Sequence, residues 1–147
     1  MNKVQEKLDK KIRTIQDFPV EGVLFRDITT LLKDAEGLHD AVDQMQHLIG
    51  EKKFDLVVGP ESRGFIFGMP LAYNLRKGFV LIRKQGKLPA AVYSREYALE
   101  YGTAAIEIHQ DAVQRGQKVI IVDDLLATGG TAKAMVDLLE DAGAEGV

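Results

Sequence analysis

The chain has 147 residues, of which 46% are hydrophobic and 28% are charged, a composition that predicts one domain with a buried core. The net charge is −3, and no basic cluster with interleaved aromatic residues occurs, which argues against nucleic-acid binding. The absence of cysteine excludes disulfides, thiolate zinc sites and a cysteine nucleophile and fits a reducing cytoplasm, and no apolar run approaches the roughly 20 residues of a membrane span.

Apolar spacing in the first third of the chain predicts two helices before the first core strand. An apolar residue recurs every three or four positions over 4–15, which predicts an amphipathic helix that ends at 18–22. A second helix is expected to begin near residue 38 and to end at Gly50. Residues 54–58 are then expected to form a strand.

The rest of the chain predicts strands that alternate with helices, and this alternation is typical of an α/β protein with a parallel sheet. Pro70 lies within the helix expected at about 64–76, where a proline is unfavourable. The expected strands are 78–82, 103–109 and 119–122, and the expected helices are about 64–76 and 132–142.

The strand expected at 103–109 has an alternating pattern. Ile106 and Ile108 would face one side of the strand, and Glu107 and His109 would face the other. This pattern predicts a half-exposed strand. His109 and the two other histidines of the chain are scattered in the sequence, so we expect surface residues rather than a metal site.

The segment 119–131, VIIVDDLLATGGT, is the most informative part of the chain. Its four β-branched apolar residues predict a buried parallel strand, and Asp123 and Asp124 stand where this strand ends. A Gly/Thr turn then runs into a helix, whose N-terminus offers backbone N–H groups and a positive dipole to a phosphate. Because an acid pair can bind a vicinal diol, the segment predicts a site for a ribose 5-phosphate.

Other nucleotide sites fit this segment less well. A Walker B strand also ends in acids, but the chain contains no G-x-x-x-x-G-K-[ST] segment and no G-x-G-x-x-G of a dinucleotide fold. A receiver domain uses an acid pair early in its fold and without a Gly/Thr loop. Taken singly, adjacent acids and a Gly-Gly turn are each compatible with a solvated turn.

Three loops are expected to open on one edge of the sheet, because each follows a parallel strand. They carry Glu-Ser-Arg at 61–63, two lysines and an arginine over 83–87, and the acid pair with its phosphate turn. Cationic and hydroxyl groups beside a phosphate turn suit a second and more highly charged anion, such as pyrophosphate.

Together these segments resemble the type I phosphoribosyltransferase family. The string VIIVDDLLATGGT is similar to the family's signature for 5-phosphoribosyl 1-pyrophosphate (PRPP), and FPVEGVLFRDIT, GPESRGFIFG, VLIRKQGKLP and ALEYG precede it in the order of the adenine-specific members. The resemblance covers nearly the whole chain. It implies one α/β domain over 1–147 with a Rossmann-like parallel sheet: an N-terminal hood over 1–33 that binds the base, and a core over 34–147 with a flexible lid at about 88–104.

The resemblance also implies an activity and its partners. In purine salvage, the phosphoribosyl group of PRPP would pass to adenine and give AMP and pyrophosphate, with Mg²⁺ held mainly by PRPP. We expect a cytoplasmic homodimer that binds neither nucleic acid nor membrane. Two alternatives stay open: a transferase for another purine or pyrimidine, and a non-catalytic protein that senses PRPP.

Each candidate residue takes its role from the resemblance. Glu100, on the lid, would be the acid or base at the purine, Arg83 would reach into the neighbouring subunit's site, and the Glu61–Ser62 peptide would be cis. The adenine would be bound by Leu24, Phe25 and Arg63, the ribose by Asp123 and Asp124, the 5-phosphate by Ala127, Thr128, Gly129, Gly130 and Thr131, and the pyrophosphate by Ser62, Arg63, Arg83, Lys84, Lys87 and Tyr101.

Three features depart from the family pattern. Glu21 stands where the family usually has proline, and the segment 90–92 lacks the hydroxyl side chains often found at the start of the lid. Family members also continue beyond residue 147 with at least one more strand, so the expected sheet lacks a strand at one edge.

Overall fold

The computed structural model describes residues 1–99 and 101–146. The chain divides into two compact units, Met1–Gly50 and Glu51–Val147. The peptide bonds Phe18–Pro19 and Glu61–Ser62 are cis, the second as the family resemblance implied. Within the described residues, no helix is long and apolar enough to cross a membrane.

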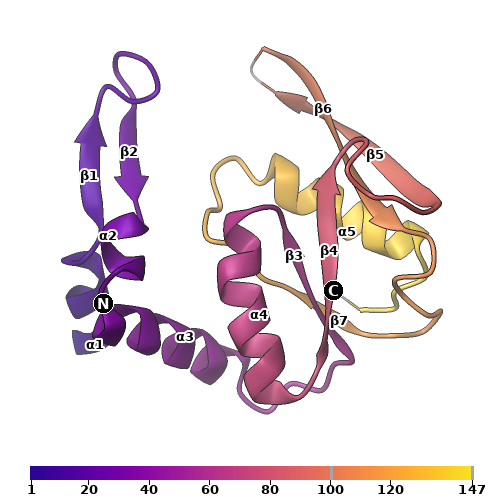
Figure 1. The fold of residues 1–147 in the computed structure, drawn as a ribbon, viewed down its shortest axis with the longest axis horizontal. Coiled ribbons are helices and arrows are strands. Elements are labelled where there is room, and N and C mark those ends of the chain that lie inside the picture. Colours follow the sequence, from indigo (N-terminus) through magenta and orange to yellow (C-terminus); the bar gives the residue numbers. More distant parts are fainter. Residues whose placement is uncertain (100, 147) are drawn as a thin grey trace. The chain divides into compact units, whose positions relative to one another are not determined.

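The first unit combines three helices with a two-stranded antiparallel sheet (Figure 1). The helix expected over 4–15 is wrong in its second half, because Ile15 pairs with Phe25 in the sheet and β-branched residues favour strands. The helix that ends at Gly50 is confirmed. The elements are α1 (Lys3–Asp9), β1 (Arg13–Gln16), β2 (Leu24–Asp27), α2 (Thr29–Leu32) and α3 (Ala35–Ile49).

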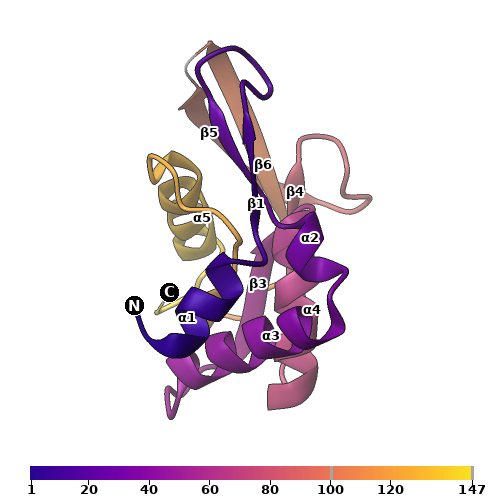
Figure 2. The same ribbon diagram turned by 90° about the vertical axis from the view of Figure 1, so that its left-hand side faces the viewer.

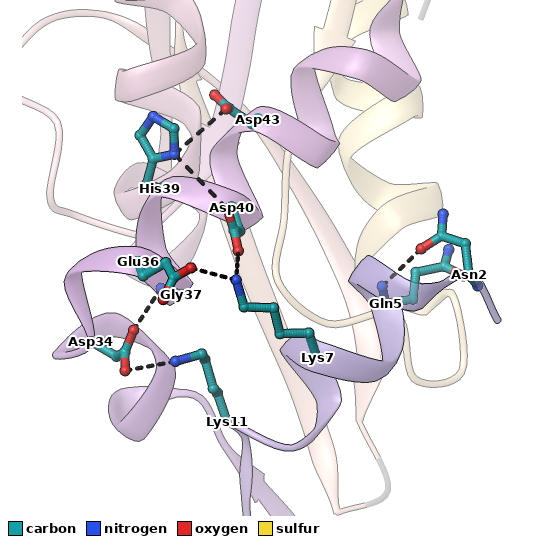
Figure 3. A network of polar contacts seen from close by, with 10 residues as sticks. All are labelled: Asn2, Gln5, Lys7, Lys11, Asp34, Glu36, Gly37, His39, Asp40 and Asp43. Atoms are coloured by element: carbon teal, nitrogen blue, oxygen red, sulfur yellow. Dashed lines mark hydrogen bonds and ion pairs between the residues drawn. The ribbon is translucent and has the colours of Figure 1, made fainter.

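Ion pairs join α1 and its C-terminal extension to the start of α3 (Figure 3). Lys7 Nζ lies 2.6 Å from Glu36 and 2.8 Å from Asp40, while Lys11 Nζ lies 2.7 Å from Asp34, which also caps the N-terminus of α3. The bonds to Asp40 and Glu36 raise the pKa of Lys7 above its usual range. Since these side chains are partly exposed, each pair contributes little to stability, and the network mainly fixes how α1 lies on α3.

The second unit is an α/β structure around a five-stranded sheet with the order β5-β6-β4-β3-β7. Strands β4, β3 and β7 run parallel to one another, which confirms the predicted parallel sheet. The strands β5 and β6 add an antiparallel hairpin, so the complete sheet is mixed. The strands are β3 (Leu56–Pro60), β4 (Gly78–Lys84), β5 (Val92–Leu99), β6 (Gly102–His109) and β7 (Val119–Ile121).

Two helices cover the two faces of this sheet. Figure 2 shows α4 (Arg63–Leu75) on one side of β3 and α5 (Gly130–Asp141) on the other. The helix α4 continues through Pro70, and its Gly68 packs so closely on Phe79 that an added Cβ would lie 2.4 Å from the ring. The core beneath α5 combines strand and helix residues that are fully or almost fully buried: Val58, Ile82, Ile108, Met135, Leu138 and Leu139.

The strand β6 corrects the prediction of a half-exposed strand at 103–109. Ile106 and Ile108 are buried as expected, but Glu107 between them is also buried, with only 7% of its surface exposed. The reason is that Ile106 and Ile108 pack into the core beneath α5, while Glu107, on the other face of β6, accepts a hydrogen bond from the Gly86 N–H in the loop after β4. The described part of the segment expected as a lid, about 88–104, contains β5 and the first residues of β6.

Candidate functional site

A cavity of about 430 Å³ opens at the carboxyl ends of the parallel strands of the second unit. The sequence predicted that loops after three strands would meet there, and the cavity lining confirms it. Residues 60–63 follow β3, Lys84 ends β4, and residues 123–132 connect β7 to α5.

The acid pair lies on one wall of this cavity. Arg63, in the first turn of α4, places its Nε 2.9 Å from Oδ2 of Asp124, whose side chain is only 7% exposed. The first turn of α4 can approach the end of β7 because residue 64 is glycine: an added Cβ would lie 2.5 Å from Pro60 and 3.0 Å from the Val122 carbonyl oxygen. The close packing thus brings Arg63 to Asp124.

The pKa of Asp123 is unusually high for a carboxyl group. Burial raises its pKa to about 6, against the opposing effect of the Asp124 backbone N–H, which donates a 2.8 Å hydrogen bond to Oδ1 of Asp123. The neighbouring Asp124 carboxylate raises the pKa further. The acid pair can therefore take up or release one proton close to neutral pH, and it can accept hydrogen bonds from a diol.

The phosphate turn, residues 127–131, leads into the N-terminus of α5. Gly129 has a left-handed backbone with φ of 87°, a conformation that glycine adopts without strain, and α5 begins at Gly130. Within the described residues, the amides of Ala127, Thr128, Gly129 and Thr131 donate no hydrogen bond, and that of Gly130 makes only a 3.3 Å bond to the Thr128 hydroxyl. The turn therefore presents free N–H groups at a helix N-terminus, the arrangement that binds phosphate.

The basic loop, residues 83–87, has the opposite hydrogen bonding. Its backbone N–H groups at Lys84, Gln85 and Gly86 all donate to acceptors from neighbouring strands or loops: the Glu61 carboxylate at 2.8 Å, the Ala105 carbonyl at 3.2 Å and the Glu107 carboxylate at 2.7 Å. Within the described residues, neither Lys84 nor Lys87 forms an ion pair through its ammonium group. The loop therefore offers side-chain charge rather than backbone donors.

The structure places most of the predicted site residues in this cavity. The residues that line it are Ser62, Arg63, Lys84, Asp123, Asp124, Ala127, Thr128, Gly129, Gly130 and Thr131. Arg83 and Lys87 line a neighbouring groove instead, and Tyr101 is exposed in the turn between β5 and β6. Leu24 and Phe25 belong to β2 of the first unit, and Glu100 lies outside the described residues.

Sequence reasoning missed several residues of the site. Leu125 and Leu126 line the cavity and are largely exposed, and two apolar residues in a polar strand-end loop were a signal that could have found them. The acceptor roles of Glu61 and Glu107 toward the basic loop were also missed. No pattern in the sequence shows that these carboxylates meet backbone amides, because the contacts join residues 21 to 23 positions apart.

The described residues contain no group of three or more histidine, cysteine or acidic side chains that could hold a metal ion. The two adjacent carboxylates are the only acidic pair that the cavity offers near its phosphate turn among the described residues. Mg²⁺ is commonly bound through one or two carboxylates together with substrate phosphates. The residues present therefore fit a metal that arrives with a phosphorylated substrate.

The fold and the site define a class of protein. Residues 28–147 match the family model described as the phosphoribosyl transferase domain. The fold itself is similar to a crystal structure from Thermoanaerobacter pseudethanolicus, with a TM-score of 0.92 and 53% identity over 95% of this chain and 81% of that one. A structure from Saccharomyces cerevisiae gives a TM-score of 0.90 at 39% identity, over 96% of this chain and 82% of that one.

These two structures and the similar curated proteins share one name, adenine phosphoribosyltransferase. The protein of that name from Lachnoclostridium phytofermentans is 55% identical over 140 residues, which are 95% of this chain and 80% of that protein. The one from Thermotoga neapolitana is 56% identical over 138 residues, or 94% and 81%. The chain belongs to the adenine phosphoribosyltransferase family, the enzymes of purine salvage that make AMP from adenine and PRPP.

Proposed function

We propose that each of these loops of the second unit binds a different part of PRPP while its phosphoribosyl group passes to adenine, giving AMP and pyrophosphate. The observation that carries this proposal is the single cavity shared by the phosphate turn, the acid pair and the cationic residues Arg63 and Lys84. The phosphate turn suits the phosphate group of a bound sugar phosphate, and the acid pair suits its hydroxyl groups. The cationic residues suit a departing pyrophosphate.

The phosphate turn holds the 5-phosphate of PRPP. Its unpaired backbone N–H groups and the hydroxyls of Thr128 and Thr131 donate to the phosphate oxygens, and the positive end of the α5 dipole adds to the attraction. The left-handed Gly129 sets the direction of these groups. The turn thereby anchors the end of the substrate that does not react.

The acid pair holds the ribose. Asp123 and Asp124 accept hydrogen bonds from the two ring hydroxyls, and negative charge beside the sugar favours the oxocarbenium-like ring that forms as pyrophosphate leaves. The 2.9 Å contact with Arg63 fixes the position of the Asp124 side chain. The Arg63 guanidinium is proposed to lie where ribose, pyrophosphate and adenine meet.

The pyrophosphate is held by cationic and hydroxyl groups. Ser62, Arg63 and Lys84 line the cavity, Lys87 and Tyr101 are proposed to add to them from its margin, and Arg83 is proposed to add to them from the neighbouring subunit. Mg²⁺ would be held mainly by PRPP, beside Asp123 and Asp124, and would supply further charge neutralisation when bound. These charges stabilise the leaving group.

By the family resemblance, Leu24, Phe25 and Arg63 are proposed to bind adenine, with Glu100 as the acid or base that handles the purine proton. The segment of about 88–104 would act as a lid that excludes water, which would otherwise hydrolyse PRPP. Structures of two relatives support these substrates: the Saccharomyces cerevisiae enzyme is complexed with an imino-altritol bisphosphate and adenine, and a Trypanosoma brucei enzyme is in complex with AMP, pyrophosphate and ribose-5-phosphate.

The working form is proposed to be a homodimer in the cytoplasm. A groove of about 530 Å³ along β4 is lined by the apolar residues Leu81, Leu88 and Pro89, and Leu81 is exposed in the single chain. A second copy would bury this surface, and Arg83 beside it would then reach the neighbouring site. Light scattering on the purified chain distinguishes a dimer from a monomer.

The test of the function is product formation with PRPP, Mg²⁺ and, one at a time, adenine, hypoxanthine, guanine, xanthine and orotate. AMP and pyrophosphate from adenine alone are the expected result, with no product when PRPP or Mg²⁺ is withheld. Turnover of another base would favour a different transferase. PRPP binding without turnover would favour a sensor, and a chain that does not bind PRPP would contradict the proposal.

A further inference from the structure

Two carboxylates at or near the cavity, those of Glu61 and Glu107, take no part in the proposed reaction. We propose that Glu61 and Glu107 are positioning residues that fix the backbone of the basic loop, so that Lys84 is held at the cavity for the pyrophosphate. This inference rests on the proposed function, since it assigns a purpose to the loop that binds the leaving group.

Glu107 holds the far end of the loop. It is a buried carboxylate on β6, and its Oε1 accepts a 2.7 Å hydrogen bond from the Gly86 N–H. Gly86 has φ of 81°, so the loop makes its turn at this residue. An ionised group is costly to bury unless it is hydrogen-bonded, and a bond from an N–H to a carboxylate is stronger than one to a neutral acceptor. A buried glutamate therefore ties this turn firmly to the sheet.

Glu61 holds the near end of the loop. Its Oε1 accepts a 2.8 Å hydrogen bond from the Lys84 N–H and lies 3.3 Å from Nε of Arg83. The backbone N–H of Glu61 also donates to the Ile82 carbonyl at 2.9 Å, so the residue is joined to β4 by its main chain and its side chain. The bond from Lys84 lowers the pKa of Glu61, which keeps the carboxylate charged at neutral pH.

The two contacts work on the same short segment from opposite sides. In the sheet β4 lies between β3, which precedes Glu61, and β6, which carries Glu107. Arg83 and Glu107 are also opposite each other in the antiparallel pairing of β4 with β6. Each carboxylate directs an oxygen to a backbone amide, so its bond fixes the main chain and leaves the lysine ammonium groups to an anion. The geometry thus assigns the carboxylates to the loop rather than to the substrate.

Calorimetric titrations with two probes test the proposal: pyrophosphate with Mg²⁺, and ribose 5-phosphate. We expect Glu107→Ala and Glu61→Ala to weaken pyrophosphate binding about tenfold, as loss of a charged hydrogen bond does, and to leave ribose 5-phosphate affinity within twofold. The Gln variants keep an oxygen acceptor, so they should regain most of the pyrophosphate affinity. Glu140→Ala, an exposed acid on α5, is the matched control and should change neither affinity.

Three results would overturn the proposal: Ala variants that bind pyrophosphate like the wild type, equal losses for both probes, or Gln variants as weak as the Ala variants. If Glu107→Ala does not fold, Glu107→Gln and the Glu61 pair decide by the same criteria. A wild-type chain that binds ribose 5-phosphate but not pyrophosphate would instead contradict the proposed function of the basic loop, and this inference with it.

Discussion

The phosphate turn and the basic loop lie at the same edge of one sheet, but their backbone N–H groups differ in hydrogen bonding. The amides of Ala127, Thr128 and Gly129 donate no hydrogen bond to described residues, whereas those of Lys84 and Gly86 are bound by carboxylates. One segment keeps its backbone donors for a ligand. The other has its backbone donors satisfied by the protein and presents side chains.

This difference follows from what each anion requires. A phosphate at the fixed end of a substrate can be held by N–H groups whose positions the fold sets in advance, and these need only a glycine turn and a helix N-terminus. A leaving pyrophosphate gains charge during the reaction, so it needs cationic side chains on a rigid base, which is the backbone of the loop. An unpaired amide in the basic loop would let that base move.

The largest expected effect distinguishes the chemical step from the binding of anions by the two loops. Glu100→Gln should lower kcat by about 10²–10⁴, the usual contribution of a general acid or base, and should leave the affinities for ribose 5-phosphate and pyrophosphate unchanged. Steady-state kinetics with adenine and titrations with the two anions check this. An unchanged kcat would remove Glu100 from the mechanism.

The next effect breaks the phosphate turn alone. Gly129→Ala forces a side chain into a left-handed conformation, which costs about 1–3 kcal/mol, so the turn should shift and ribose 5-phosphate affinity should fall by about 10- to 100-fold. Pyrophosphate affinity should stay. Gly116→Ala is the matched control, because Gly116 has φ of 90° outside the site and should lose stability without losing affinity. Loss of both affinities in Gly129→Ala would contradict the division between the loops.

A smaller effect concerns the stability of the acid pair. Because folding raises the pKa of Asp123 from 3.8 to about 6, its ionised form destabilises the fold, and this penalty is absent below about pH 4 and complete above about pH 6. Asp123→Asn should therefore melt at the same temperature as the wild type near pH 4 and about 3–6 °C higher near pH 7.5. Thermal unfolding at both pH values measures it. A difference in Tm that does not depend on pH would contradict the assigned cause.

The smallest effect tests whether the phosphate turn works through its backbone. Lys133 lies in the first turns of α5, is exposed and pairs with Asp137 at 2.6 Å, an i,i+4 contact that stabilises a helix by about 0.3–0.5 kcal/mol. Lys133→Met should change ribose 5-phosphate affinity less than twofold. A tenfold loss in a titration would show that a nearby charge, rather than the amides, holds the phosphate.

The sequence predicted the elements whose pattern is local. The apolar run 119–122, the helix that ends at Gly50 and the loops after the parallel strands could be read directly, because burial and turn chemistry leave a mark on neighbouring residues. The gathering of Ser62, Arg63, Lys84 and the acid pair in one cavity also followed, since parallel strands end at one edge.

The parts that could not be predicted depend on distant partners. The alternation around Glu107 looked half-exposed, and only the contact of Glu107 with the Gly86 N–H, in the loop after β4, shows why this side chain is buried. The segment after α1 continued a helical spacing, yet Ile15 joined β2. In both places, a segment from elsewhere in the chain decided the environment, and the local sequence pattern does not show this.

Residue-resolved amide hydrogen exchange, followed by NMR, tests the contrast between the loops most directly. In the free protein, the amides of Lys84 and Gly86 should exchange slowly, while those of Ala127, Thr128 and Gly129 should exchange rapidly and become protected when ribose 5-phosphate is added. Fast exchange at Lys84 and Gly86, or a phosphate turn that ribose 5-phosphate does not protect, would contradict the account.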